Sequence, residues 1–235
     1  MNRICTIGAR GGSKGVPNKN LKVLLGKPLI AHSIDQAKQS NLFDCIAVSS
    51  DSDDILSVAQ QYGADVLVKR PKEMATDTAA KLPVIQHCVQ FAEKATMQKF
   101  DVIVDLDATS PLRLVDDIIQ SVQVFENNQQ ATNLITGMPS RRSPYFNLVE
   151  LNDKGHVELS KNLKQPIVRR QDSPKCFDMN ASIYIWRRDT LLNCTSVFME
   201  GTILYEMPEE RSIDIDSEID FEFVSFLAKK RGFLS

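Results

Sequence analysis

The sequence predicts an α/β fold in which a mostly parallel sheet carries helices on both faces. Short apolar runs of strand length alternate with amphipathic helical patterns through the first half of the chain. Polar or glycine-rich loops follow several of these runs. Neither a Gly/Ser-rich linker nor an internal repeat divides the 235 residues. We therefore expect one domain over residues 1–235.

The first half supplies most of the predicted elements. Apolar runs predict strands at residues 3–9, 45–49, 65–69, 102–106 and 131–137. Helices are predicted where apolar residues recur at i, i+3, i+4 and i+7, over residues 28–40, 55–62, 82–92 and 115–125. Pro28 suits the first turn of its helix, because proline needs no hydrogen-bond partner for its nitrogen there.

The regular alternation stops after residue 137, where prolines, asparagines and arginines interrupt short polar segments. We expect residues 138–178 to form an inserted lobe that serves dimerisation and sugar binding. After the lobe, strands are predicted at residues 180–186 and 201–205, and helices at residues 189–192 and 217–230.

The composition is ordinary for a globular protein, with 43% hydrophobic and 25% charged residues and a net charge of −2. This balance predicts no nucleic-acid partner and no attachment to an anionic membrane. No apolar run has the length of a membrane span, and no signal peptide is evident. The five cysteines are scattered and form no C-x-x-C pair, so we expect reduced thiols in a cytoplasmic protein.

A basic, glycine-rich loop follows the first predicted strand. Glycines bring backbone N–H groups close to an anion, and arginine and lysine add positive charge. The next predicted helix begins only at about Pro28, whereas a P-loop or a dinucleotide fingerprint leads directly into a helix, so neither motif fits. We expect this loop to bind a polyphosphate, the alternative being a solvated surface loop. Its glycines, hydroxyl and cations are Arg10, Gly11, Gly12, Ser13, Lys14, Gly15 and Lys19.

Two carboxylates stand near the C-terminus, at Asp214 and Asp216. In a strand, residues two apart face the same side, so these carboxylates are expected to lie together before the last helix. Paired carboxylates beside a polyphosphate are typical of a Mg²⁺ site. The alternative is a capped helix start at Asp216 or Ser217.

Other loops also follow predicted strands and should open on the same edge of the sheet. Residues 49–53 are rich in helix-capping side chains, and residues 107–113 bring hydroxyls and Arg113 to that edge. Arg70 and residues 77–79 suit either a base pocket or a turn and a helix cap. The cationic stretch at residues 169–171 suits a substrate carboxylate or a plain surface.

These motifs resemble those of the acylneuraminate cytidylyltransferases, also called CMP-sialic acid synthetases. The matching stretches run nearly end to end in family order, at residues 9–15, 19–20, 77–78, 109–113 and 214–216. The resemblance implies a Rossmann-like nucleotidyltransferase fold. It also implies a homodimer that joins CTP to a nine-carbon 2-keto sugar acid, with Mg²⁺ as cofactor and release of pyrophosphate.

The resemblance further implies roles for individual residues. Catalysis is assigned to Arg10, Lys19 and Asp216, and the metal to Asp214 and Asp216. Nucleotide binding is assigned to Arg10, Gly11, Gly12, Ser13, Lys19, Asn20, Arg70, Thr78, Ala79 and Thr109. Sugar binding is assigned to Asp107, Arg169, Arg170, Gln171 and Tyr184.

Two positions depart from the pattern of the sialic acid enzymes. Asp107-Ala108 replaces the usual Gln-Pro, and Lys81 replaces a small hydroxyl residue near the base. An ionised Asp107 only accepts hydrogen bonds, so it is expected to change the sugar choice or to join the metal site. With residues 142–146, this form resembles the bacterial branch that activates legionaminic or pseudaminic acids for surface glycans, and legionaminate is favoured.

Several alternatives to CMP-legionaminate synthesis stay open at this point. The sugar acid could be N-acetylneuraminate or pseudaminate, and the enzyme could use another sugar or another nucleotide. A non-catalytic nucleotide-binding protein of the same fold is the alternative from a different class.

Overall fold

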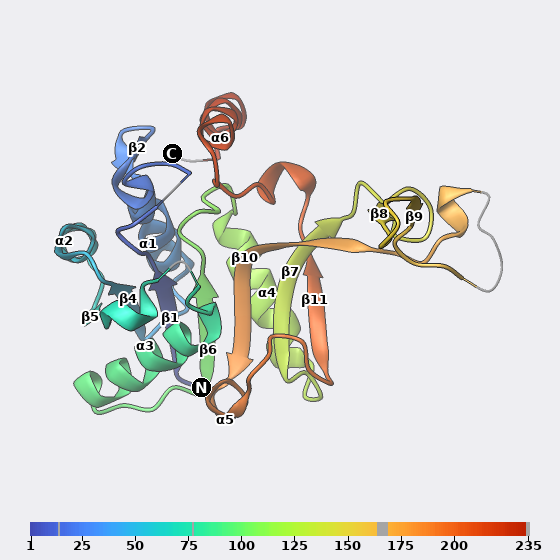
Figure 1. Cartoon of the computed structure of the whole chain (residues 1–235). Helices are drawn as coiled ribbons and strands as arrows, with labels where there is room; N and C mark the ends of the chain where they lie inside the picture. Colours follow the sequence, from blue (N-terminus) through green and yellow to red (C-terminus); the bar gives the residue numbers. More distant parts are fainter. Residues whose placement is uncertain (14, 77, 164–168, 234–235) are drawn as a thin grey trace.

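The computed structural model describes residues 1–13, 15–76, 78–163 and 169–233, and Figure 1 shows how their elements are arranged. Its main sheet has the strand order β11-β7-β10-β6-β1-β4-β5. All neighbouring strands are parallel except β10, which is antiparallel to β6 and β7. The predicted mostly parallel sheet is confirmed. Its strands are β1 (Arg3–Gly8), β4 (Cys45–Ser50), β5 (Val66–Lys69), β6 (Val102–Leu106), β7 (Asn133–Pro139), β10 (Phe177–Arg187) and β11 (Thr202–Glu206).

Helices cover both faces of the sheet, as predicted. One face carries α1 (Leu29–Ser40), α2 (Asp53–Gln61) and α4 (Val115–Asn127). The opposite face carries α3 (Lys81–Thr96) and α5 (Arg188–Asn193). The last helix, α6 (Glu218–Arg231), packs on a separate small apolar cluster instead of on the sheet. Three short 3-10 turns complete the helical elements of the main body: η1 (Lys19–Leu21), η2 (Lys72–Met74) and η4 (Glu209–Arg211).

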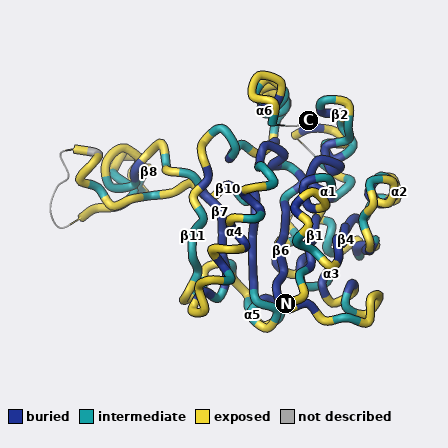
Figure 2. The backbone as a smooth tube through the Cα atoms, turned by 180° about the vertical axis from the view of Figure 1, so that it is seen from behind, coloured by how far each residue is buried: buried dark blue, intermediate teal, exposed yellow. Residues whose placement is uncertain are grey.

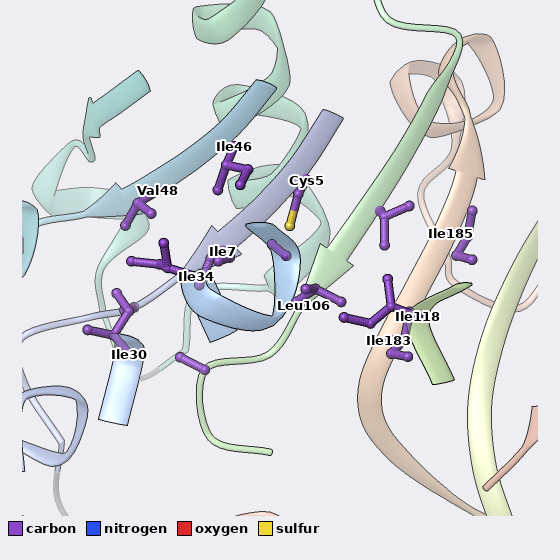
Figure 3. Close-up of a cluster of buried hydrophobic side chains, with 14 of the residues drawn as sticks. Cys5, Ile7, Ile30, Ile34, Ile46, Val48, Leu106, Ile118, Ile183 and Ile185 are labelled. Atoms are coloured by element: carbon purple, nitrogen blue, oxygen red, sulfur yellow. The ribbon is translucent and has the colours of Figure 1, made fainter. Parts of the chain in front are cut away.

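The central strands are largely apolar because both of their faces are buried. In β1, Ile4 packs on the α3 side, whereas Cys5 and Ile7 pack on the α1 side. Figure 3 shows Cys5 and Ile7 together with Ile34 of α1 and Leu106 of β6. Successive side chains of a strand point to opposite faces, so one short run of sequence contributes to two cores.

The basic loop contains structure that the apolar pattern did not predict. Between β1 and α1 lie the turn η1 and a small hairpin of β2 (Val23–Leu24) and β3 (Lys27–Pro28). Helix α1 nevertheless begins at Leu29, directly after Pro28. The predicted strand at Asp214 and Asp216 is wrong, because residues 213–215 have no regular structure and Asp216 lies in a bend.

The segment between β7 and β10 extends away from the main body as an arm, defined here as residues 140–176 (Figure 1). It contains the hairpin of β8 (Val149–Leu151) and β9 (Val157–Leu159) and the turn η3 (Arg170–Asp172). Figure 2 shows that the backbone around β8 is largely exposed, in contrast to the buried central strands. Residues 164–168 lie outside the described part of the chain.

A bulge interrupts β10 between Met179 and Tyr184, where its pairing with β7 shifts register. The buried Asn180 amide holds this bulge: it accepts a hydrogen bond from Thr136 Oγ1 at 2.6 Å and donates one to Ser212 Oγ at 2.9 Å. Bulges bend a strand and redirect its backbone groups. Here the carbonyl of Ser182 is redirected to accept from the N–H of Asp107 at 3.1 Å.

All five cysteines are free, as predicted. Within the described ranges, the helices are too short or too polar to cross a membrane.

Candidate active site

A cavity of about 380 Å³ opens beyond the carboxyl ends of β1 and β6. It is lined by residues from the basic loop, from the loop after β5, from the start of α3, from the loop after β6 and from the segment before α6. The expectation that distant loops share one edge is therefore confirmed. The predicted site residues that line it are Arg10, Ser13, Lys19, Asn20, Arg70, Ala79, Asp107, Thr109 and Asp216.

The basic loop is held in place by side chains from two directions. The N–H of Gly11 donates to Asp51 Oδ1 at 2.9 Å, so Asp51 from the loop after β4 secures the glycine turn. Asn20 donates to the carbonyl of Arg10 at 3.0 Å. Gly11 and Gly12 do not line the cavity, and Lys14 lies outside the described residues. Cations, more than glycine N–H groups, therefore face the cavity from this loop.

Gly15 allows the basic loop to touch the segment before α6. A Cβ atom at this position would lie 1.9 Å from the backbone oxygen of Asp216, which is closer than any two such atoms can approach. Lys19 reaches the same segment, donating to the carbonyl of Ile215 and lying 3.2 Å from Asp216 Oδ1. Only glycine fits at this contact.

Asp214 and Asp216 lie close enough to repel each other. Burial raises the pKa of Asp214, and the negative charge of Asp216 raises it further. A divalent cation would relieve this repulsion, and Mg²⁺ commonly binds one or two carboxylates together with phosphate and water. Across the described parts of the chain, no three His, Cys, Asp or Glu side chains converge as a ready-made metal site. The two carboxylates thus fit a metal that the polyphosphate helps to hold.

The helix cap considered as an alternative for this segment is also present. Ser217 is the N-cap of α6 and accepts from the N–H of Asp220, while the Asp220 carboxylate accepts from the N–H of Ser217 at 2.7 Å. This reciprocal capping box fixes where the helix begins. It therefore fixes the position of Asp216, one residue before the cap.

The floor of the cavity holds a charged group that the sequence did not predict as a site. Lys81 Nζ lies 2.9 Å from Asp107 Oδ2 and 3.1 Å from Asp105 Oδ2. Burial opposes the charge on each group. For Asp107 the Lys81 ammonium outweighs burial and lowers the pKa to about 2, and for Lys81 the two carboxylates raise the pKa. Lys81 and Asp107 are therefore both charged at neutral pH.

Signals for this group were present in the sequence. Asp105 and Asp107 are two apart at the end of β6, and Lys81 was noted only as a departure from a family pattern. Sequence reasoning missed the other wall residues, of which several belong to the apolar start of α3. The lining residues not predicted as site residues are Gly8, Gly15, Met74, Thr76, Lys81, Val84, Ile85 and Asp105.

Arg113 does not reach the binding edge, contrary to the sequence prediction. It is fully buried, and its Nη1 donates to the carbonyls of Asp107 and Ser110, each at 2.8 Å. Burial lowers the pKa of this guanidinium to about 10, which still leaves it charged at neutral pH. Arg113 thus satisfies the carbonyls of the loop that presents Asp107 and Thr109.

The side of the cavity next to α3 is partly apolar and includes Met74, Thr76 and Ala79. Arg70 lies here, buried, and its guanidinium donates to the carbonyl of Ser49 at 2.8 Å. Thr78 does not line the cavity, and Asp77 lies outside the described residues. This wall combines flat apolar surface with few polar groups, as a base pocket requires.

The remaining predicted sugar residues lie elsewhere. Tyr184 is 4% exposed and sits beneath Lys81, whose ammonium is 4.5 Å from the ring centroid. Arg169 pairs with Asp172 on the arm at 2.8 Å. Gln171 lines a second cavity of about 520 Å³ at the base of the arm. Gln171 belongs to a turn of the arm and does not line the first cavity, and the side chain of Arg170 lies outside the described part of the structure.

The contact at Gly15 yields a stability prediction. Gly15→Ala should lower the free energy of unfolding by about 1–3 kcal/mol, because the new methyl group overpacks a backbone contact. Gly12→Ala is the matched control, since no atom lies within 4 Å of the added Cβ. Urea titrations of both variants measure the difference, and equal stability of the two would contradict the contact.

Comparison with known proteins agrees with this geometry. A protein from Campylobacter coli called post-translational flagellin modification protein B is 49% identical over 97% of this chain and 96% of its own length. The CMP-N,N'-diacetyllegionaminic acid synthase of Campylobacter jejuni is 48% identical over 95% of this chain and 94% of its own.

The fold also recurs in a solved structure. The CMP:2-keto-3-deoxy-manno-octonic acid synthetase complexed with CTP superposes with a TM-score of 0.73 at 18% identity, covering 98% of this chain and all of that one. The family described as cytidylyltransferase matches residues 4–234. With relatives this similar over nearly its whole length, the chain belongs to the cytidylyltransferase family.

Proposed function

We propose that this protein joins CTP to a nine-carbon 2-keto sugar acid and releases pyrophosphate, with N,N'-diacetyllegionaminic acid as the preferred sugar. The observation that carries the proposal is the cavity in which Arg10 and Lys19 face Asp216, in a chain 48% identical to a CMP-N,N'-diacetyllegionaminic acid synthase. The product would enter glycans of flagellin or of the bacterial surface, and the free thiols accord with a cytoplasmic reaction.

The chemistry follows from the charges around the cavity. The anomeric hydroxyl of the sugar attacks the α-phosphorus of CTP, and the bond to pyrophosphate breaks. Arg10, Ser13 and Lys19 bind the phosphates and stabilise the negative charge that develops during transfer. Asp214 and Asp216 would hold magnesium, which would supply Lewis-acid neutralisation of the phosphate oxygens. No covalent intermediate with the protein is required.

The nucleotide and the sugar are assigned to different walls. Asn20, Arg70, Ala79 and Thr109 surround the nucleoside. Gly11, Gly12 and Thr78, assigned to the nucleotide from the sequence, do not line the cavity. Asp107 faces the sugar, where an ionised carboxylate selects a hydrogen-bond donor such as a hydroxyl or an acylamino N–H. This preference favours a diacylated sugar acid.

A substrate panel tests the proposal. With CTP and Mg²⁺, pyrophosphate release should be fastest with N,N'-diacetyllegionaminic acid and slower with pseudaminic acid and N-acetylneuraminic acid. ATP, GTP and UTP serve as nucleotide controls. If none of the sugar acids supports release from CTP, the proposed function is wrong. If another sugar acid of the panel reacts fastest, only the proposed identity of the sugar is wrong, and the reaction with CTP stands.

Asp216→Asn tests the metal assignment. We expect kcat to fall by at least about 100-fold, because charge stabilisation at the phosphates is lost, while CTP binding stays measurable by calorimetry. The side chain of Asp216 is 78% exposed, so the loss should not come from unfolding. Glu218→Gln, two residues away and paired with Lys22, is the control and should retain activity. Unchanged turnover in Asp216→Asn would show that the metal is wrongly assigned to this carboxylate.

We also propose a homodimer in which the arm of one subunit completes the sugar site of its partner through Arg169, Arg170 and Gln171. The arm has little core of its own, and its cross-strand pair Leu151 and Val157 is 71% and 67% exposed. Exposed apolar pairs of this kind mark interaction surfaces.

Sedimentation equilibrium tests the assembly. The protein should have twice the mass of one chain, and replacing Leu151 and Val157 together by glutamate should yield a monomer, because the charges cannot be buried in an interface. Glu150→Ala and Glu158→Ala, the neighbouring polar pair of the same hairpin, serve as the control. A wild-type protein that is monomeric at micromolar concentration contradicts the dimer.

A further inference from the structure

The charged group on the cavity floor has the geometry of a small cation site. Asp105 Oδ2 and Asp107 Oδ2 converge on one point, which the Lys81 ammonium occupies at 3.1 Å and 2.9 Å. Asp105 is 1% exposed, and its Oδ2 accepts no hydrogen bond, so the ammonium is its charge partner. An unpaired carboxylate at this depth would be strongly destabilising.

Other residues hold the two carboxylates in place independently of Lys81. Thr6 Oγ1 donates to Asp105 Oδ1 at 2.8 Å. The N–H and hydroxyl of Thr109 donate to Asp107 Oδ1 at 2.9 Å and 2.8 Å. The inner oxygens are therefore fixed by hydrogen bonds, and the outer oxygens point together whether or not a lysine lies between them.

Helix formation does not explain a lysine at this position. Lys81 is the first residue of α3, a helix with no acidic residue in its first turn and no side-chain cap. The positive end of a helix disfavours a cation there. The ammonium instead finds its favourable contacts at the two carboxylates and above the ring of Tyr184.

We propose that the ammonium of Lys81 takes the place of a divalent cation at Asp105 and Asp107, and that it keeps this preorganised carboxylate pair free of metal. Two carboxylates open to a water-accessible cavity are sufficient ligands for Mg²⁺ or Mn²⁺, which retain several waters. A lysine ammonium is a compact point charge that fits the same position. The inference concerns the free protein and does not depend on the sugar or the nucleotide.

The choice of cation sets the charge of the floor. Lys81 brings one positive charge to the two carboxyl groups, whereas a divalent cation would bring two. A less positive floor attracts phosphate less strongly and leaves a polyphosphate to Arg10 and Lys19. This last consequence rests on the proposed function.

Mn²⁺ binding to the full chain, without nucleotide or sugar, tests the proposal. The free Mn²⁺ signal in electron paramagnetic resonance reports the bound metal. Asp214→Asn with Asp216→Asn provides a background without the proposed magnesium carboxylates. In that background, Lys81→Met should bind one Mn²⁺ per chain at least about 10-fold more tightly than the parent with Lys81. Mn²⁺ should also raise its melting temperature, because the metal binds only the folded state.

Three further variants in the same background serve as controls. Lys81→Arg keeps a cation and should open no site. Lys69→Met removes a lysine from the surface carboxylate of Asp53 and should also open none. Adding Asp107→Asn to Lys81→Met should abolish the new site.

The proposal is overturned if folded Lys81→Met binds Mn²⁺ no more tightly than its parent, or if Lys69→Met gains the same affinity. If Lys81→Met does not fold, Lys81→Gln is judged by the same criterion, since its amide can still donate to one carboxylate. A gain of metal affinity in Lys81→Met, together with a wild-type chain that releases no pyrophosphate from CTP with any sugar of the panel, would support this inference and contradict the proposed function.

Discussion

The active-site cavity depends on the anchoring of Ile215 between two loops. Its N–H donates to the carbonyl of Thr109 at 2.9 Å, and its carbonyl accepts from Lys19. Its side chain is fully buried in the small cluster that also contains Val16 of the basic loop. One apolar residue therefore fixes the carboxylates on either side of it. The side chain of Asp216 is largely exposed, so its ion pair with Lys19 contributes little. The packing of Ile215 therefore positions the carboxylates at least as much as charge attraction does.

Buried polar groups determine the shape of the opposite half of the cavity. The carbonyl of Ser182, within the bulged part of β10, faces the loop after β6, and Arg113 donates to it and to the carbonyls of Asp107 and Ser110 in that loop. Such a network is expensive to leave incomplete, since each unpaired group would cost about 1–3 kcal/mol. The position of Asp107 is thus set by residues that never touch a substrate.

The sequence was sufficient for the strands and helices because each local pattern agrees with the final fold. It failed where the same local pattern has two structural meanings. Ile213, Ile215 and the intervening Asp214 alternate like a strand, yet the isoleucines face a satellite cluster and no neighbouring strand pairs with them. Arg113 looked like a ligand because its partners are backbone carbonyls, of Asp107, Ser110 and the distant Ser182, which a linear pattern does not reveal.

The pairing of Lys81 with Asp107 was also not predictable from a local pattern. The two residues are 26 positions apart and meet only when α3 packs on the sheet. Assignments that the family pattern implies fared differently by location. Most of those in the loops after β1, β5 and β6 line the cavity, as does Asp216, whereas Asp214 and Tyr184 do not, and Gln171 of the arm lines a second cavity.

The contact between Lys19 and Asp216 joins residues 197 positions apart. A contact of such high sequence separation closes a very long loop, and the entropy of that closure is lost before the contact returns any energy. A growing polypeptide also carries the phosphate-binding cations long before it carries either late carboxylate. The cavity is therefore completed only after residue 216 has been made, and a shorter nascent chain has the cations of Arg10 and Lys19 without the carboxylates of Asp214 and Asp216.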